Sequence, residues 1–282
     1  MKIAVSTLPF RTWPLERVLQ CCCRNGYSAL EIRMDFHPWS CTALVDDHYL
    51  EAYSQIRSAG LHVSNLGSGI VLAKDSEEEF QKLIRLFEIA DCLRTKGVRI
   101  MLGHIRLNRL WPESPLDRDG ILRWLVRADQ LARQSGKEVW IETHNEFATG
   151  RSLSRIFQEV PLFSTRVIWD VMHPLEQGET VEETLDFLGN RLVHVHIKDG
   201  VPWDDPNQMI WKYTPIGEGV IPISKIIRLL RRRGYDGYYS LEWESAWRKE
   251  LAELDCDEMQ IRDFPGCLLD MNHRLPEIKE LL

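Results

Sequence analysis

The chain has 282 residues, and its hydrophobic fraction of 44% is enough to bury a large core. It carries 35 Lys and Arg against 42 Asp and Glu, a formal net charge of −7, which disfavours a nucleic-acid-binding protein because such proteins usually present a basic surface. No apolar run reaches the roughly 20 residues of a membrane helix. The first apolar run is broken by Pro9 and Pro14 and is too short for a secretory signal. The 7 cysteines show no C-x-x-C spacing and indicate reduced thiols, so we expect a cytoplasmic protein.

Apolar runs rich in β-branched residues alternate along the chain with stretches of helical spacing. The predicted strands are 2–7, 29–34, 62–67, 97–102, 138–143, 166–170, 192–197 and 237–242. Regular strand–helix alternation indicates a parallel sheet, because parallel neighbours need crossover connections. Eight such units predict an α/β fold, a single (β/α)8 TIM barrel that forms one domain over residues 1–282. The alternative is an open doubly wound sheet, but no G-x-G-x-x-G motif follows the first strand to support its dinucleotide-binding form.

Capping signals mark the ends of several predicted helices. The helical pattern that starts at residue 15 ends at Asn25-Gly26, a typical carboxyl-terminal cap. A second pattern opens with Ser76 and Glu79 at capping-box spacing, and we expect it to run to Gly97. A third is expected to end at Gly234.

Polar side chains gather at the predicted carboxyl ends of the strands, where a TIM barrel carries its active site. They are Glu31, Arg33, Asn65, His104, Glu142, Asp170, His173, His194, His196, Lys198, Asp199, Glu242 and Glu244. A lone Asp or His at a strand end is usually a cap or a satisfied hydrogen-bonding residue. The last four strands each end in a carboxylate or an imidazole, which favours one shared site.

Two Glu, one Asp and one His would form a mixed oxygen and nitrogen donor set with room for substrate and water. Such a set suits one divalent ion, Mn²⁺, Mg²⁺, Co²⁺ or Zn²⁺, and no thiolate is present to favour a softer metal. We therefore expect Asp170 to hold a metal ion and His173 to face the ligand or the surroundings of the metal.

Five segments together resemble the sugar phosphate isomerase/epimerase family of xylose isomerase-like TIM barrels, whose members include ketose 3-epimerases, hydroxypyruvate isomerase, inosose dehydratase and endonuclease IV. The segments are IETHNEF, VIWDVMHP, LVHVHIKDG, IGEGVIPISKII and GYDGYYSLEWE. The resemblance is best between about residues 138 and 247. It implies four metal ligands at the ends of the last four strands, which fall on Glu142, Asp170, His196 and Glu242.

Two of these assignments have neighbours on the same strand face. His194 precedes His196 by two residues and fits a deeper layer of the barrel, and Glu244 shares the face of Glu242. His196 is preferred because it lies nearer the carboxyl end of its strand.

The resemblance also implies a substrate contact for His173, which matches a histidine that touches substrate oxygens in the epimerases. Further substrate-binding candidates are Lys198, His104, Asn65 and Trp203. For Lys198, a structural lysine paired with an aspartate fits equally well.

The sequence departs from the family pattern at two places, and each departure disfavours one of the family's activities. Pro202 stands where the ketose epimerases carry an arginine that binds a substrate hydroxyl, and the connecting segment 200–213 supplies Trp203, Trp211 and two aspartates instead. Endonuclease IV needs an Asp-x-His triplet after the seventh strand, and none follows His196. The first departure disfavours epimerisation of free ketohexoses, and the second disfavours DNA repair.

The resemblance implies proton transfer next to a carbonyl, with a divalent ion stabilising the enediolate and Glu142 and Glu242 acting as acid and base. We expect a metal-dependent isomerase or epimerase of a sugar or sugar derivative. Its partner would be a small sugar, keto sugar or cyclitol substrate. We expect no nucleic-acid or membrane partner, and a homo-oligomer remains an alternative to a monomer. The alternative is a dehydratase of an inosose- or dehydroshikimate-like keto compound. A non-catalytic sugar-binding protein and an endonuclease IV-like repair enzyme fit less well.

Overall fold

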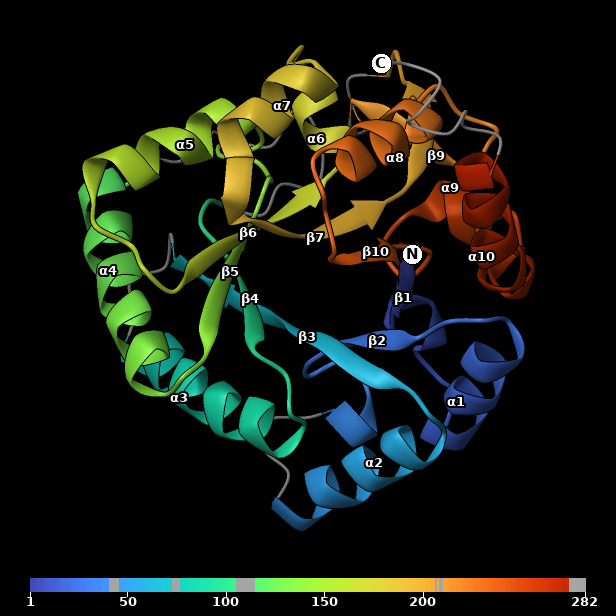
Figure 1. The fold of residues 1–282 in the computed structure, drawn as a ribbon, viewed down its shortest axis with the longest axis horizontal. Coiled ribbons are helices and arrows are strands. Elements are labelled where there is room, and N and C mark those ends of the chain that lie inside the picture. Colours follow the sequence, from blue (N-terminus) through green and yellow to red (C-terminus); the bar gives the residue numbers. More distant parts are fainter. Residues whose placement is uncertain (41–45, 73–76, 105–114, 206, 208–209, 274–282) are drawn as a thin grey trace.

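The computed structural model describes residues 1–40, 46–72, 77–104, 115–205, 207 and 210–273. Eight parallel strands close into a barrel in the order β1-β10-β7-β6-β5-β4-β3-β2, and Figure 1 shows the helices around it. The barrel strands are β1 Lys2–Ser6, β2 Ala29–Arg33, β3 His62–Val71, β4 Gly97–Met101, β5 Glu138–Glu142, β6 Thr165–Asp170, β7 Leu192–Ile197 and β10 Tyr238–Leu241. The TIM barrel is therefore confirmed, and the open doubly wound sheet is excluded.

Helices fill most of the connections between consecutive barrel strands. They are α1 Leu15–Arg24, α2 Asp46–Ser58, α3 Glu77–Cys92, α4 Arg118–Gln134, α5 Gly150–Glu159, α6 Met172–Glu176, α7 Val181–Leu188 and α8 Ile223–Arg232. Two further helices, α9 Lys249–Ala252 and α10 Asp257–His273, follow the last barrel strand. The predicted ends of α1 and α8 are confirmed, since Gly26 and Gly234 follow them with φ of 82° and 70°.

The predicted end of α3 at Gly97 is wrong. The helix stops at Cys92, and the chain turns at Arg94, which adopts a φ of 50°. Gly97 instead begins β4, where a Cβ atom would lie 2.3 Å from the ring of Trp140. The glycine is thus needed for close packing inside the barrel and not for a helix cap. Ser76, the proposed start of the capping box, lies outside the described residues.

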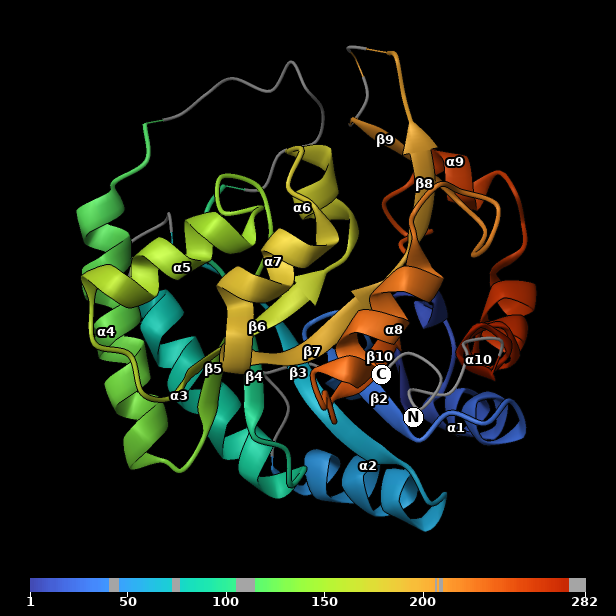
Figure 2. The same ribbon diagram turned by 45° about the horizontal axis from the view of Figure 1, so that its top comes forward.

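The segment after β7 was expected to be a connecting loop, but it forms an antiparallel arm. Its strands are β8 Asp199–Pro202 and β9 Trp211–Thr214, and the arm projects from the barrel in Figure 2. The buried carboxylate of Asp199 anchors its base, accepting hydrogen bonds of 2.8–3.1 Å from the backbone NH groups of Gly200, Gly217, Gly219 and Ile221. A single aspartate therefore ties the arm to the segment that leads into α8.

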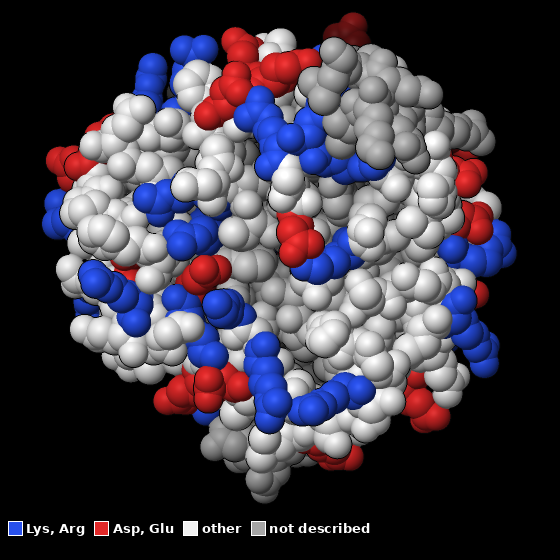
Figure 3. Space-filling view, in the orientation of Figure 1, with Lys and Arg blue, Asp and Glu red and all other residues white. Residues whose placement is uncertain are grey.

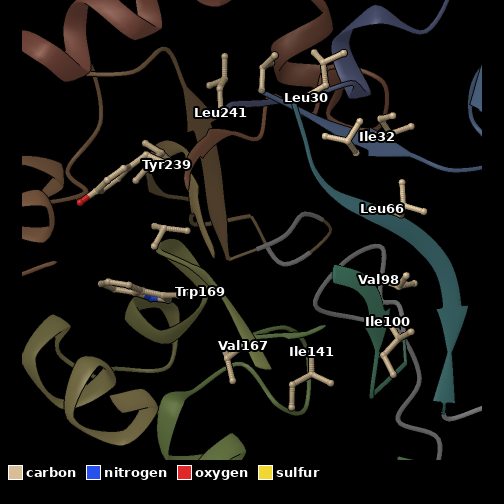
Figure 4. Close-up of a cluster of buried hydrophobic side chains, with 14 of the residues drawn as sticks. Leu30, Ile32, Leu66, Val98, Ile100, Ile141, Val167, Trp169, Tyr239 and Leu241 are labelled. Atoms are coloured by element: carbon tan, nitrogen blue, oxygen red, sulfur yellow. The ribbon is translucent and has the colours of Figure 1, made fainter. Parts of the chain in front are cut away.

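The main hydrophobic core lies between the barrel and the helices. Ten strand residues at alternate positions face outward into it (Figure 4), and each is at most 3% exposed. They are Leu30, Ile32, Leu66, Val98, Ile100, Ile141, Val167, Trp169, Tyr239 and Leu241. Because strand side chains alternate between the two faces of a sheet, the residues between them point into the barrel.

The interior of the barrel is rich in buried polar groups. Glu31 lies between Leu30 and Ile32, and Arg99 lies between Val98 and Ile100; both charged side chains are buried. The other buried interior residues include Asn65, Glu142, Asp170, His194, His196 and Ser240. The fold therefore separates an apolar shell from a central column of charged and hydrogen-bonding groups.

On the face shown in Figure 3, Lys and Arg side chains are interspersed with acidic and uncharged ones. Among the residues that the structure describes, no helix combines the length and the apolar character that crossing a membrane requires.

We predict that Asp129→Ala lowers the free energy of unfolding by about 2–4 kcal/mol, because it leaves buried donors without their charged acceptor. Asp129 is 2% exposed and accepts hydrogen bonds from Phe163 N, Ser164 N and Thr165 Oγ1 at 2.7–3.1 Å, which joins α4 to the start of β6. Urea denaturation followed by circular dichroism measures the loss.

Asp186→Ala is the matched control. Its carboxylate is 69% exposed and forms an ion pair with Arg233 at 2.5 Å, so this change should cost less than about 1 kcal/mol. Equal losses in the two variants would show that Asp129 is not a structural anchor.

Candidate metal centre

Four buried side chains from neighbouring strands converge inside the carboxyl end of the barrel. Glu142 ends β5, Asp170 ends β6, His196 lies on β7, and Glu242 follows β10 directly. One donor atom from each lies within 4.8 Å of the others. The convergence follows from the parallel register, in which Asp170 pairs with His196 and His196 pairs with Ser240, two residues before Glu242. We call these four residues the quartet.

The imidazole of His196 is held between carboxylates on both sides. Its Nδ1 lies 2.9 Å from Glu142 Oε1 and 3.3 Å from Glu242 Oε2, while its Nε2 lies 3.0 Å from both oxygens of Glu31. Burial disfavours the charged ring, but the carboxylates of Glu242, Glu31 and Glu142 raise the pKa of His196 well above its usual value. Glu31 thus fixes the ring so that Nδ1 faces the rest of the quartet.

Lys198 lies among three carboxylates beside the quartet. Its Nζ is 2.7 Å from Asp170 Oδ2, 2.5 Å from Glu242 Oε2 and 2.6 Å from Glu244 Oε1. The pairing with Asp170 is the one expected of a structural lysine. Asp170 Oδ2 and Glu242 Oε2 nevertheless accept no hydrogen bond of good geometry within the described part of the chain.

A divalent ion fits this donor set. Three carboxylates and one imidazole are the ligands that Mn²⁺, Mg²⁺, Co²⁺ and Zn²⁺ accept. Bonds of about 2.1 Å place donor atoms roughly 3–4.2 Å apart, close to the 4.8 Å limit within which the quartet atoms lie. The two buried oxygens without a well-formed hydrogen bond, on Asp170 and Glu242, belong to the same set.

Two further side chains, Arg99 and His173, contact carboxylates of the quartet. Arg99 donates from Nη1 to Glu142 Oε2 at 2.7 Å. Burial opposes ionisation of Glu142, but His196 and Arg99 hold the pKa of its carboxyl below the usual range. His173 Nε2 lies 3.2 Å from Asp170 Oδ2 and its Nδ1 lies 3.1 Å from Glu176 Oε2. Against the effect of burial, these carboxylates raise the pKa of His173 to about 9.

The other predicted substrate-binding residues are placed differently. Asn65 is buried one layer deeper and donates to Glu31 Oε1 at 3.1 Å. His104 is partly exposed and lies with Nδ1 3.1 Å from Glu146 Oε1. Trp203 lies on the β8–β9 arm, where its backbone NH donates a hydrogen bond to the carbonyl oxygen of Ile210 at 2.8 Å. Across the described ranges, no hydrogen bond or ion pair joins these three directly to the quartet.

Glu31 and Arg99 also contact the quartet, although Glu31 was expected only as one of the polar residues at the strand ends and Arg99 was not expected there. Glu31 contacts His194 as well as His196, at 3.0 Å from His194 Nε2, and these three residues form a second group that could hold a metal ion. The sequence signal for both Glu31 and Arg99 was a charged residue inside an apolar strand, at a position where the alternation of side chains points into the barrel. His194 lies in the deeper layer, as its spacing from His196 indicated.

The chain belongs to the xylose isomerase-like TIM barrel family, whose model matches residues 22–260. A putative hydroxypyruvate isomerase of Streptomyces coelicolor is 23% identical over 243 residues, which cover 78% of this chain and 81% of that protein. A fructoselysine 3-epimerase of Escherichia coli O157:H7 is 35% identical over a shorter match, which covers 29% of this chain and 27% of that protein. An uncharacterized protein of Methanocaldococcus jannaschii is 28% identical over a match that covers 40% of this chain and 39% of that protein. The chain thus spans well under half of these two relatives.

Solved structures share the fold at low identity. The IOLI protein with a bound zinc atom has a TM-score of 0.77 at 18% identity, covering 96% of this chain and 98% of that one. A probable 3-DHS dehydratase of Bacillus anthracis has a TM-score of 0.71 at 19% identity, covering 90% and 98%. At these identities the likeness establishes the barrel architecture.

We predict that Lys198→Met lowers the free energy of unfolding of the chelator-treated protein by about 3–5 kcal/mol, because three carboxylates would lose their buried counter-charge. Lys249→Met is the control, since that side chain is 89% exposed and its loss should change stability by less than about 0.5 kcal/mol. Urea unfolding measures both. A change below about 1 kcal/mol in Lys198→Met would mean that the lysine does not neutralise the cluster.

Proposed function

We propose that this protein is a divalent-metal-dependent isomerase or epimerase of a sugar or sugar derivative. The observation that carries the proposal is the quartet, in which donor atoms of Glu142, Asp170, His196 and Glu242 lie within 4.8 Å of one another at the carboxyl end of the barrel. Membership of the xylose isomerase-like family supports it. The named relatives include an epimerase and a putative isomerase.

In this proposal the quartet holds one Mn²⁺, Mg²⁺, Co²⁺ or Zn²⁺ ion. The ion supplies Lewis acidity toward a carbonyl oxygen of the substrate when it is bound. The zinc atom in the IOLI structure supports a metal in this fold. Glu31 orients His196 for its ligand role by accepting from Nε2 at 3.0 Å.

In this proposal two members of the quartet carry out the proton transfers: Glu142 at the end of β5 and Glu242 directly after β10. One carboxylate removes the proton on the carbon next to the carbonyl, and the other returns a proton to the opposite face in an epimerase or to the adjacent carbon in an isomerase. The side chain of Glu242 is 9% exposed and that of Glu142 is 1% exposed, with both Glu142 oxygens engaged by Arg99 and His196. We therefore assign the first abstraction to Glu242.

Dehydration is the second candidate, supported by the likeness of the fold to a probable 3-DHS dehydratase. It shares the first proton abstraction and differs in expelling a β-hydroxyl group. Its conjugated product absorbs in the ultraviolet and an isomer does not, so absorbance during turnover separates the two reactions. The quartet disfavours a non-catalytic sugar-binding protein, because binding alone needs no pair of acid–base carboxylates.

The test uses the Mn²⁺-loaded protein and a panel of keto sugars and keto cyclitols in D₂O, followed by proton NMR. Glu242→Gln should lose both turnover and exchange of the α-proton. Glu142→Gln should lose turnover by about 10²-fold or more, because a general base is missing, yet retain exchange. If both variants turn over at near-normal rates with metal bound, the two-carboxylate mechanism is wrong. The reversed exchange pattern would move the first abstraction to Glu142.

A further inference from the structure

Two arginines lie side by side in the barrel next to the quartet. Arg33 on β2 and Arg99 on β4 both pair in register with Gly67 of β3. Their Nη atoms donate to the same carbonyl, that of Ser68, at 2.6 Å from Arg33 and 3.1 Å from Arg99. The two guanidinium groups therefore occupy one corner of the barrel interior.

Only one of the two guanidinium groups forms an ion pair. Arg99 forms an ion pair with Glu142 at 2.7 Å. Arg33 is bonded through Nη1 alone, to the carbonyls of Ser68 and Gly67, and among the described residues no carboxylate lies within ion-pair distance of it. Burial and the charge of Arg99 lower the pKa of Arg33 to about 10, although the carboxylates of Glu242, Glu142 and Glu31 act to raise it, so it remains a cation at neutral pH. A largely enclosed cation that forms no direct ion pair is costly.

The open edge of Arg33 has the geometry of an anion receptor. With Nη1 donating to backbone carbonyls, Nε and Nη2 donate to no acceptor in the described part of the chain. Parallel N–H groups on one edge of a guanidinium grip both oxygens of a carboxylate or phosphate. A Cβ atom at Gly69 would meet only Arg33 Nη2, at 3.9 Å, so space is left beside that nitrogen.

The position of Arg33 links this edge to the quartet. Arg33 follows Glu31 by two residues, so both side chains point into the barrel, with Arg33 nearer its carboxyl end. Arg33 and Arg99 share the carbonyl of Ser68, and Arg99 contacts Glu142, so a single side chain separates Arg33 from one member of the quartet. The carboxylates of Glu142 and Glu242 also act on the pKa of Arg33, which fits this short separation, so a small molecule at the quartet can reach Arg33.

We propose that Arg33 binds an anionic group of the substrate, a carboxylate or a phosphate, and that the protein acts on an acidic sugar derivative. The inference rests on the proposed function, since it places the substrate at the quartet. Arg99 is left to hold Glu142, and the open space next to Gly69 receives the anionic end.

The experiment measures binding by isothermal titration calorimetry to the Mn²⁺-loaded protein. The probes are D-gluconate, D-glucitol 6-phosphate and the neutral D-glucitol, which share a six-carbon polyol chain. Wild type should bind at least one acidic probe about tenfold or more tightly than glucitol, because charge-assisted hydrogen bonds replace contacts with water. The probe with the larger preference identifies the acidic group.

Arg33→Gln should reduce that preference to about twofold or less, and Arg33→Lys should restore part of it. Arg233→Gln, at an exposed ion pair, is the control and should keep the full preference. An acidic preference that survives in Arg33→Gln, or no preference in wild type, overturns the proposal. Mn²⁺ affinity is measured in each variant and should be unchanged in Arg33→Gln; failure of wild type to bind Mn²⁺ would count against the proposed function instead.

Discussion

The structure depends on balancing the carboxylates that it buries inside the barrel. Glu31, Glu142, Asp170 and Glu242 are each at most 7% exposed, and an isolated buried carboxylate is strongly unfavourable. His196 and Lys198 lie between them, and Arg99 neutralises one side of Glu142. The arrangement is therefore a connected network of opposite charges, in which the loss of one partner leaves others buried and unpaired.

The same alternation that builds this network also stabilises the fold around it. Each barrel strand turns one set of side chains outward, where Leu30, Leu66, Val98 and Trp169 pack under the helices and are completely buried. The other set faces inward and carries the charges. Because the outer shell supplies the hydrophobic burial, the interior is free to hold groups chosen for chemistry rather than packing. Separating the two roles allows a costly polar centre to lie in the middle of a stable barrel.

Much of this could be predicted from sequence, because period-two alternation and strand–helix repetition are local signals. Because parallel strands of a barrel end at the same edge, the predicted strand ends alone indicate that Glu142, Asp170, His196 and Glu242 lie near one another. The partners of those residues could not be found in the same way. Glu31 reaches His196 across the barrel, from a position 165 residues away in sequence. No local pattern indicates that contact, and the same holds for Arg99 and Glu142.

Other differences have identifiable physical causes. Helical periodicity continued past Cys92, but the left-handed turn at Arg94 and the close packing of Gly97 against Trp140 end α3 early. The polar, proline-containing segment after β7 indicated a loop, whereas it forms the antiparallel pair β8–β9, whose base is held by four backbone hydrogen bonds to Asp199. In both cases, contacts between residues that are apart in sequence decide the local structure, and single-sequence patterns do not contain them.

The most direct test of the account is an anomalous difference map at the manganese absorption edge, from crystals of the protein loaded with Mn²⁺. The account predicts one strong peak bonded to at least three of Glu142, Asp170, His196 and Glu242. The structure also offers a competing location, the group formed by Glu31, His194 and His196. A peak bonded to that group instead, or to fewer than two of the four quartet residues, would contradict the central claim.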